Sequence, residues 1–318
     1  MTPSNPPSPL RMTPVSCPGC AAQATSILTE GKDFEYATSD DTFTMVRCDA
    51  CRLVHLNPRP HASELERIYP PHYLPYQFDQ RGGTMLRVRQ WLQRGSMRAW
   101  QAHISPTADI LDAGCGGAGF LDLLRRHGSP DWKLWGNDIG PAALEAVTKA
   151  GHRALPGRFE ELDVPDGSFD LILFRQVIEH LDAPSRVIQR AARLLRPGGL
   201  LILETPNLDA WDPRLFQERY WGGYHFPRHW TLFDADTLGR LVREAGLQIH
   251  RVDYLLSPSF WIQSCHHLLM ERGAPGYVSN FFHTLNPIVA GLAVCTDLAQ
   301  RMISGRTSNM RMVCVRPH

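Results

Sequence analysis

A glycine-rich turn directly after a short apolar segment constrains the fold more than any other feature of the sequence. The segment is Asp109-Ile-Leu-Asp-Ala, the turn is Gly114-Cys-Gly-Gly-Ala-Gly, and residues 121–128 continue with the apolar spacing of a helix. Glycine lets backbone N–H groups approach a ligand closely at the start of a helix. The pattern predicts a strand, a ligand-binding turn and a helix, although a glycine turn alone does not identify the ligand.

A second apolar segment, residues 132–137, ends at Asp138, which lies 26 residues after Asp112. A carboxylate that ends the second strand of such a unit can accept hydrogen bonds from both ribose hydroxyls of a nucleoside. Helical patterns over 141–150 and 183–195 then alternate with strand patterns over 169–174 and 200–204. This alternation predicts an α/β fold with a doubly wound parallel sheet and a ligand at the carboxyl ends of its strands.

Four of the eight cysteines form two pairs, Cys17-Pro-Gly-Cys20 and Cys48-Asp-Ala-Cys51. Two such pairs in one short segment match the ligand set of a tetrahedral zinc site. All four ligands would be protein thiolates, so the predicted role of the zinc is structural, and the metal would supply folding energy to a small unit. We expect a zinc ribbon over residues 15–60; redox-active or incidental pairs are the alternative.

The composition narrows the set of partners and compartments. The chain has 33 basic and 32 acidic residues and a formal net charge of +1, which argues against binding to nucleic acid through a basic field. Residues 1–14 begin rich in Pro and Ser and lack the apolar stretch of a signal peptide, so we expect a disordered tail. Without a run of about 18 apolar residues, we expect no transmembrane segment and a cytoplasmic protein.

Several motifs resemble those of class I S-adenosylmethionine (SAM)-dependent methyltransferases, in the order of that family over residues 109–255. They are Asp112-Ala-Gly-Cys-Gly, Gly136-Asn-Asp-Ile-Gly-Pro-Ala-Ala-Leu, Pro165-Asp-Gly-Ser-Phe-Asp, Val177-Ile-Glu-His-Leu, Leu195-Arg-Pro-Gly-Gly-Leu and Glu204-Thr-Pro-Asn. Residues 47–60 resemble the zinc-ribbon extension that precedes many bacterial methyltransferases of this type. The resemblance implies a Rossmann-like seven-stranded sheet and methyl transfer from SAM. Ala118 stands where the family often has Gly, and a small residue still fits there.

The resemblance also implies how individual residues bind SAM. Asp112, Gly114 and Gly116 would form the loop beneath the methionine part. Asp138 would hold the ribose, and Ile139 would pack on the adenine.

The remaining implied contacts to SAM lie further along the chain. Arg158 stands near the place where the family often has an acidic residue for the adenine amine, so Phe159 and Glu160 become the candidates for the adenine edge. Arg175 and Gln176, after the fourth strand, would face the methionine part.

Glu179, His180 and His229 are the candidates for acting on the methyl acceptor. In ubiquinone-type O-methyltransferases and small-RNA 2′-O-methyltransferases, an E-x-x-E-H run and a later His bind a divalent metal that polarises the acceptor hydroxyl. Here Gln176 replaces the first Glu of that run. Three interpretations stay open: a second, divalent metal on Glu179, His180 and His229; His229 or His180 as a general base; or a structural helix start.

Two late segments bear on the acceptor and on assembly. Residues 220–230 contain a group of large ring side chains, which either form the wall of a site for an apolar or planar acceptor or pack as the core of a lid. They are Tyr220, Trp221, Tyr224, His225, Phe226 and Trp230. Residues 254–296 contain only two formally charged residues, Glu271 and Arg272. We expect an apolar helical insertion over about 256–306 that caps the active site or forms a homodimer contact.

The predicted organisation is therefore a zinc ribbon, a helical linker or lid over 61–105, with a helix over 85–104, and a methyltransferase domain over 106–318. The predicted reaction is methyl transfer from SAM to a small-molecule acceptor at oxygen, with His229 or His180 as base. One alternative is C-methylation of a keto sugar or another enolisable metabolite. The other is a SAM-binding assembly protein without activity.

Overall fold

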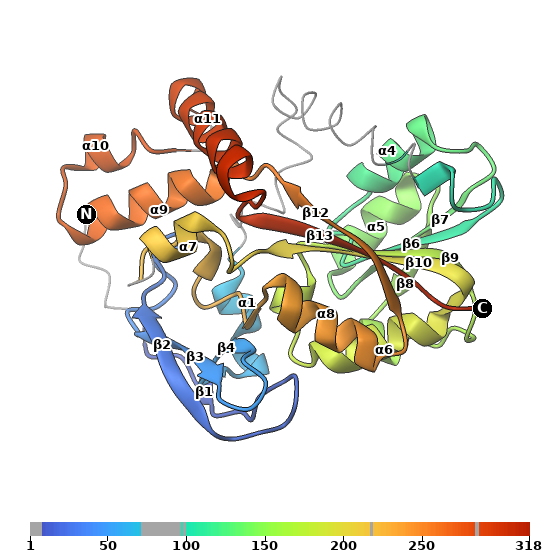
Figure 1. Cartoon of the computed structure of the whole chain (residues 1–318), viewed down its shortest axis with the longest axis horizontal. Helices are drawn as coiled ribbons and strands as arrows, with labels where there is room; N and C mark the ends of the chain where they lie inside the picture. Colours follow the sequence, from blue (N-terminus) through green and yellow to red (C-terminus); the bar gives the residue numbers. More distant parts are fainter. Residues whose placement is uncertain (1–7, 71–96, 98–99, 217–218, 284–285) are drawn as a thin grey trace.

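A seven-stranded sheet runs through the centre of the molecule (Figure 1). The structure, a computed structural model, describes residues 8–70, 97, 100–216, 219–283 and 286–318. The strands, in spatial order, are β12 (Gln248–Leu255), β13 (Asn309–Val315), β10 (Leu195–Pro206), β9 (Phe169–Arg175), β6 (Asp109–Ala113), β7 (Lys133–Asp138) and β8 (Arg153–Pro156). β13 is antiparallel to β10 and β12, and the other pairs are parallel. The predicted doubly wound, Rossmann-like sheet is confirmed.

The central strands are apolar on both faces of the sheet. Along β9, Leu171 and Leu173 belong to one core cluster, and Ile172 and Phe174 belong to the other. Successive side chains of a strand point to opposite faces, so a strand that is covered on both faces is a continuous apolar run. For this reason residues 169–174 could be predicted as a buried strand.

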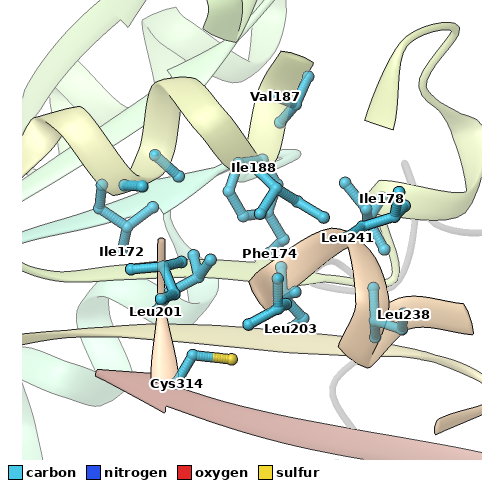
Figure 2. Packing of buried hydrophobic residues seen from close by; sticks show 14 of the residues in the cluster. Ile172, Phe174, Ile178, Val187, Ile188, Leu201, Leu203, Leu238, Leu241 and Cys314 are labelled. Atoms are coloured by element: carbon cyan, nitrogen blue, oxygen red, sulfur yellow. The ribbon is translucent and has the colours of Figure 1, made fainter. Parts of the chain in front are cut away.

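Helices cover both faces of this sheet (Figure 1). α4 (Gly119–His127) and α5 (Pro141–Lys149) lie on one face, and α6 (Pro184–Leu194) and α8 (Ala235–Glu244) lie on the other. Figure 2 shows Val187 and Ile188 of α6, and Leu238 and Leu241 of α8, packed over side chains of β9, β10 and β13. α4 begins at the glycine-rich turn, so the turn lies at the edge of the sheet where the parallel strands end.

A second sheet combines three strands of the ribbon with one strand from the domain of the seven-stranded sheet. Its order is β11 (Thr231–Leu232), β4 (Val54–Leu56), β3 (Phe43–Cys48) and β2 (Thr25–Gly31). β1 (Met12–Thr13) pairs with β5 (Arg59–Pro60), and Leu10 is buried. The prediction of a disordered tail over residues 1–14 is therefore wrong for residues 8–14. Strand pairing and the burial of Leu10 order this segment, although its composition predicted neither of them.

Most of the ring side chains of residues 220–230 are core residues. Trp221, Tyr224, Phe226 and Trp230 are at most 8% exposed and share a core cluster with Phe43 and other ribbon residues. Of the two alternatives left open by the sequence, core packing therefore applies to these four. The core that they form joins the ribbon to the domain of the seven-stranded sheet. Tyr220 and His225 are only partly buried.

A buried ion pair crosses the same junction. Both side chains, Arg228 and Asp33, are fully buried, and the guanidinium donates to both carboxylate oxygens at 3.0 and 2.8 Å. Arg228 also donates to the carbonyl oxygens of Ile68 and Phe226. Burial alone would raise the pKa of Asp33, but the hydrogen bonds and charge of Arg228 outweigh it and hold that pKa below its usual value.

Helices follow β12 and precede β13, the last strand. They are α9 (Pro258–Glu271), α10 (Gly276–Ser279) and α11 (Pro287–Ser304), and α9 packs against both of the others. α11 exposes Ile288, Leu292 and Met302; a cap and a homodimer contact stay predictions for this face. Among the described residues, no helix combines the length and apolar character needed to cross a membrane.

The shorter elements complete the described chain. They are η1 (Ala62–Glu64), α1 (Leu65–Ile68), η2 (Phe159–Glu161), η3 (Ile178–His180), α7 (Trp211–Leu215) and η4 (Gly222–Tyr224). Most of the helix predicted over 85–104 lies outside the described residues, as does most of the predicted linker over 61–105.

Asp33→Ala should lower the free energy of unfolding by about 3 to 5 kcal/mol, because it leaves the Arg228 charge buried without its partner. Urea unfolding at neutral pH measures the change, and Asp40→Ala, in the same loop but exposed, is the matched control. The pKa of Asp33 is lowered in the folded state, so the contribution is complete above the unfolded pKa of about 4 and is lost as pH falls through the folded value. Equal midpoints for the two variants would show that the pair does not stabilise the junction.

Candidate active site

The glycine-rich turn is tied to the end of the neighbouring strand. The N–H of Gly116 donates to Asp138 Oδ2 at 2.9 Å, and the N–H of Gly140 donates to Oδ1 at 2.8 Å. Gly114 and Gly116 have φ of +65° and +61°, a region that favours glycine. A Cβ on Gly114 would lie 2.7 Å from the side chain of Val177, whereas one on Gly116 would meet nothing within 4 Å. The turn is thus packed against the segment after β9 on one side and open on the other.

Asp112 and Ile139 flank this turn. Asp112, in β6, is 3% exposed and lies beside Gly136 of β7 in the strand register. Ile139, which follows β7, is 67% exposed. An exposed aliphatic side chain next to the Asp138 carboxylate has the chemistry to cover a flat ring. The residues predicted to bind the methionine part, the ribose and the adenine of SAM therefore lie together at one edge of the sheet.

The two candidates for the adenine edge have partners within the protein. The ring of Phe159 is 5% exposed and packs edge-on against Phe174, with ring centroids 4.8 Å apart. Glu160 pairs with Arg158, which also donates to Asp182 Oδ1 at 2.7 Å. Both assignments to adenine stay predictions.

Arg175 and Gln176 lie at the carboxyl end of β9. The guanidinium carbon of Arg175 lies 3.5 Å from the ring centre of Phe120, and its Nε lies 3.6 Å from Glu204 Oε2. Gln176 has φ of +58°, and its Nε2 donates to Asn309 Oδ1 at 3.0 Å. The predicted contact of these two residues with methionine stays a prediction.

Three imidazoles, His180, His225 and His229, form what we call the histidine cluster. η3 positions His180, and the loop after η4 positions the other two. The ring of His229 lies 4.7 Å from that of His180 and 4.9 Å from that of His225, centre to centre. His180 and His225 are 6.2 Å apart. Because Val177, at the start of η3, contacts Gly114, the cluster lies on the segment that borders the glycine-rich turn.

The hydrogen bonds assign the protons of two of these rings. His180 Nδ1 lies 3.0 Å from the carbonyl oxygen of Arg228, and His229 Nδ1 lies 2.7 Å from that of Gly223. Since a carbonyl oxygen only accepts, both rings carry a proton on Nδ1 and a lone pair on Nε2. Burial lowers the pKa of His180 to about 3 and that of His229 well below its usual value, so both rings are neutral at physiological pH.

Glu179 completes the predicted catalytic set. Its side chain is 0% exposed, Oε2 accepts from Thr205 Oγ1 at 3.0 Å, and Oε1 has no hydrogen-bond partner among the described residues. Burial raises its pKa to about 8. Ligand atoms of Glu179, His180 and His229 all lie within 4.8 Å of one another. Two neutral imidazoles and one carboxyl group, once the carboxyl group has lost its proton, suit a divalent cation, and the unpartnered oxygen is consistent with one.

Three further residues at this site were not predicted from the sequence. Glu35 Oε1 lies 2.7 Å from His225 Nδ1, and the ring of Tyr36 lies 6.2 Å from that of His225, edge-on. The Tyr69 hydroxyl lies 3.0 Å from His180 Nδ1. Glu35 and Tyr36 come from the ribbon loop between β2 and β3. The available signal was an acidic residue between two aromatic residues in Phe34-Glu-Tyr.

The four paired cysteines converge as predicted. Cys17 and Cys51 are 3.5 Å apart between sulfur atoms, as are Cys20 and Cys48, and all four sulfur atoms lie within 4.8 Å of one another. Ligands of a tetrahedral zinc with Zn–S bonds of about 2.3 Å are about 3.8 Å apart. Buried nitrogen atoms of Arg240, without a hydrogen-bond partner among the described residues, lie near this cluster. The positive charge of Arg240 beside the four sulfur atoms is what a cluster of thiolates would need. The distances between the sulfur atoms and this neighbouring charge therefore both suit a zinc site.

Comparisons with known proteins agree with the arrangement at this sheet edge. Residues 85–252 match a protein family described as "Methyltransferase domain". A Mycolicibacterium smegmatis protein named "Probable S-adenosylmethionine-dependent methyltransferase" is 33% identical over 150 residues, covering 46% of this chain and 55% of that protein. The ubiquinone biosynthesis O-methyltransferase of Albidiferax ferrireducens is 31% identical over 118 residues, covering 34% and 46%. This chain thus spans about half the length of the curated relatives that it matches.

A solved structure shares the fold. It is a chain from the complex between the Haloferax volcanii Trm112 methyltransferase activator and its methyltransferase partner. The TM-score is 0.50 at 17% sequence identity, and the match covers 77% of this chain and 98% of that chain. At this identity the likeness concerns the fold alone.

Cys48→Ser should remove the zinc that we expect the purified protein to carry, at about one ion per chain, because three thiolates hold zinc less well than four. Inductively coupled plasma mass spectrometry measures the content. Cys295→Ser, which changes an exposed cysteine remote from the cluster in sequence, is the matched control and should retain the zinc. Metal-free wild-type protein with an intact ribbon would contradict the assignment.

Proposed function

The chain belongs to the family of SAM-dependent methyltransferases, and we propose that it transfers the methyl group of SAM to an oxygen atom of a small-molecule acceptor. The observation that carries this proposal is the pair of Nε2 lone pairs on His180 and His229, beside Glu179 and next to the glycine-rich turn. An acceptor hydroxyl must lose its proton as it is methylated, and these are groups that can take it.

SAM binding is proposed for the edge of the sheet at β6 and β7. Asp112, Gly114 and Gly116 form the loop under the methionine part, and the open space at Gly116 supports this role. Asp138 holds the ribose hydroxyls with lone pairs of the carboxylate that already fixes the turn, and Ile139 covers the adenine. When bound, SAM supplies a methyl group that is activated by its sulfonium sulfur.

The histidine cluster then serves the acceptor. The protein must hold the acceptor oxygen in line with the methyl group and accept the proton of the hydroxyl. Nε2 of His229 or His180 is the proposed proton acceptor, because the carbonyl partner of each Nδ1 keeps the lone pair on Nε2. Burial keeps both rings neutral, so the lone pair is present across the physiological pH range.

The proposal of a small planar acceptor rests on the partly exposed rings around the cluster. Tyr36 and Tyr69 each contact one of its histidines and are partly exposed, as is His225. Such side chains suit a phenol or another flat ring with a hydroxyl. The ubiquinone biosynthesis O-methyltransferase among the relatives supports oxygen as the methylated atom. The net charge of +1 does not favour nucleic acid as the acceptor.

A divalent cation is the second way in which this site could activate a hydroxyl. Glu179, His180 and His229 would hold it, and it would act as a Lewis acid that lowers the pKa of the acceptor hydroxyl. Gln176, which stands where a glutamate would be expected, would supply no anionic ligand to this cation. A second metal beyond zinc, bound by the wild-type protein and lost in Glu179→Gln, would favour this mechanism over a histidine base.

The function is tested by incubating the protein with 13C-methyl-labelled SAM and a set of phenols and catechols that begins with 3,4-dihydroxybenzoate. Mass spectrometry detects the methylated product, and carbon-13 NMR distinguishes a methyl group on oxygen from one on carbon. We expect an O-methyl product. A C-methyl product would replace this proposal with methylation of an enolisable carbon.

Asp138→Ala should abolish SAM binding in isothermal titration calorimetry, because it removes the ribose acceptor and the partner of two turn N–H groups. Asp131→Ala, an exposed aspartate on the loop before β7, is the control and should bind like wild type. Unchanged affinity in Asp138→Ala would reject the ribose assignment.

His229→Gln should lower kcat by about 10²- to 10⁴-fold, the usual contribution of a general base, while leaving the Kd for SAM unchanged. Glutamine can still donate to the Gly223 carbonyl but lacks a basic nitrogen. Release of S-adenosylhomocysteine measures the rate, and His250→Gln, at an exposed histidine, is the control. If His229→Gln keeps its rate and His180→Gln loses it, the base is His180.

A further inference from the structure

The ribbon loop between β2 and β3 enters the catalytic domain in a fixed conformation. Asp33, at its start, accepts from the N–H groups of Tyr36 and Thr38 at 3.1 and 3.0 Å, and from the Thr38 hydroxyl. The same carboxylate is held by Arg228. The loop is therefore closed on itself and anchored to the segment that carries the histidine cluster.

Glu35 lies within this fixed loop and joins three parts of the molecule. Its Oε1 lies 2.7 Å from His225 Nδ1, and its Oε2 accepts from Gln263 Nε2 of α9 at 3.2 Å. His267 Nε2, also of α9, is 4.0 Å from Oε1. The Glu35 side chain is 12% exposed and that of His225 is 11% exposed. One carboxylate thus ties the ribbon to the histidine cluster and to the apolar insertion.

The surroundings keep Glu35 as an anion. Burial alone would raise its pKa, but the charge and hydrogen bond of His225, with the nearby His267 and Arg228, lower it overall. A carboxylate anion beside Nδ1 is an acceptor, so the Nδ1 of His225 carries a proton that it donates to Glu35. The Nδ1 proton of His225 is then held in the same way as those of His180 and His229, with a side chain in place of a backbone carbonyl.

The backbone of His225 also depends on its contacts. Its φ of +40° and ψ of 48° lie in the left-handed region, which a residue other than glycine holds only where its surroundings fix it. The hydrogen bond to Glu35 and the ring contacts with Tyr36 and His229 hold His225 in this backbone conformation. Two of these three partners belong to the ribbon loop.

From this geometry we propose that the zinc ribbon is part of the acceptor site and that Glu35 is a positioning residue for the histidine cluster. Glu35 accepts the Nδ1–H of His225 and fixes this ring against His229. The role in catalysis rests on the proposed methyl transfer, whereas the proton position of His225 does not depend on any acceptor.

Nitrogen-15 NMR of histidine-labelled protein tests the proton position without an acceptor. Two-bond couplings from ring protons to Nδ1 and Nε2 identify the tautomer of each ring, and His225→Gln assigns the signal of His225. We expect a protonated Nδ1 in wild type and a mixture of tautomers in Glu35→Gln, whose amide can donate as well as accept. A wild-type His225 with its proton on Nε2 overturns the proposal, whatever the outcome of the methylation assay.

Kinetics with the phenol identified in the methylation assay, or with 3,4-dihydroxybenzoate, test the positioning role. Glu35→Gln should lower kcat by about 10- to 100-fold, as for carboxylates that orient functional imidazoles, with an unchanged Kd for SAM. Glu30→Gln removes the same charge from an exposed position of β2 and should retain wild-type kcat. Equal kcat values for these two variants, both folded and with SAM bound, would reject the positioning role while leaving the methyl transfer intact.

Discussion

The buried ion pair between Arg228 and Asp33 is the interaction on which the candidate active site depends. Both charges are fully buried, so the loss of either side chain would leave the other charge buried without its partner. The carbonyl oxygen of the same Arg228 accepts from Nδ1 of His180, and residues 225 and 229 flank it in the chain. The pair therefore fixes the position of the ribbon and, through the backbone around residue 228, the geometry of the histidine cluster.

Much of the fold was predictable because its signals are local. The apolar run of β9, the glycine-rich turn and the carboxylate at Asp138 each act within a few residues, and the order of the motifs supplied the rest of the seven-stranded sheet. The junction with the ribbon gave no such signal. β11 has only two residues, Thr231–Leu232, and its partner strand β4 belongs to the ribbon, far away in the sequence. Trp221 and its aromatic neighbours suit a ligand wall and a core equally well, and only their contact with the ribbon decides for the core.

The residues of the candidate site also fall into a group that was predictable from the sequence and a group that was not. Glu179, His180 and His229 were predicted from motifs, and the structure brings their ligand atoms within 4.8 Å of one another. The contribution of Glu35 was not predictable, because it lies 190 residues from His225 and no local motif links the two residues. A local sequence pattern indicates which side chains can perform chemistry. The residue that orients those side chains, here Glu35, is brought to them by packing between segments that are distant in the sequence.

The contacts of the β2–β3 loop have a consequence for how such proteins diverge. A ribbon exchanged for that of a relative would bring its four cysteines intact but would break the pairs 33–228 and 35–225 unless both members of each pair changed together. We expect substitutions at these positions to be correlated among related sequences. Chimaeras made at a boundary near residue 60 would then combine two mismatched halves of the proposed acceptor site, because these halves come from segments that lie far apart in the chain.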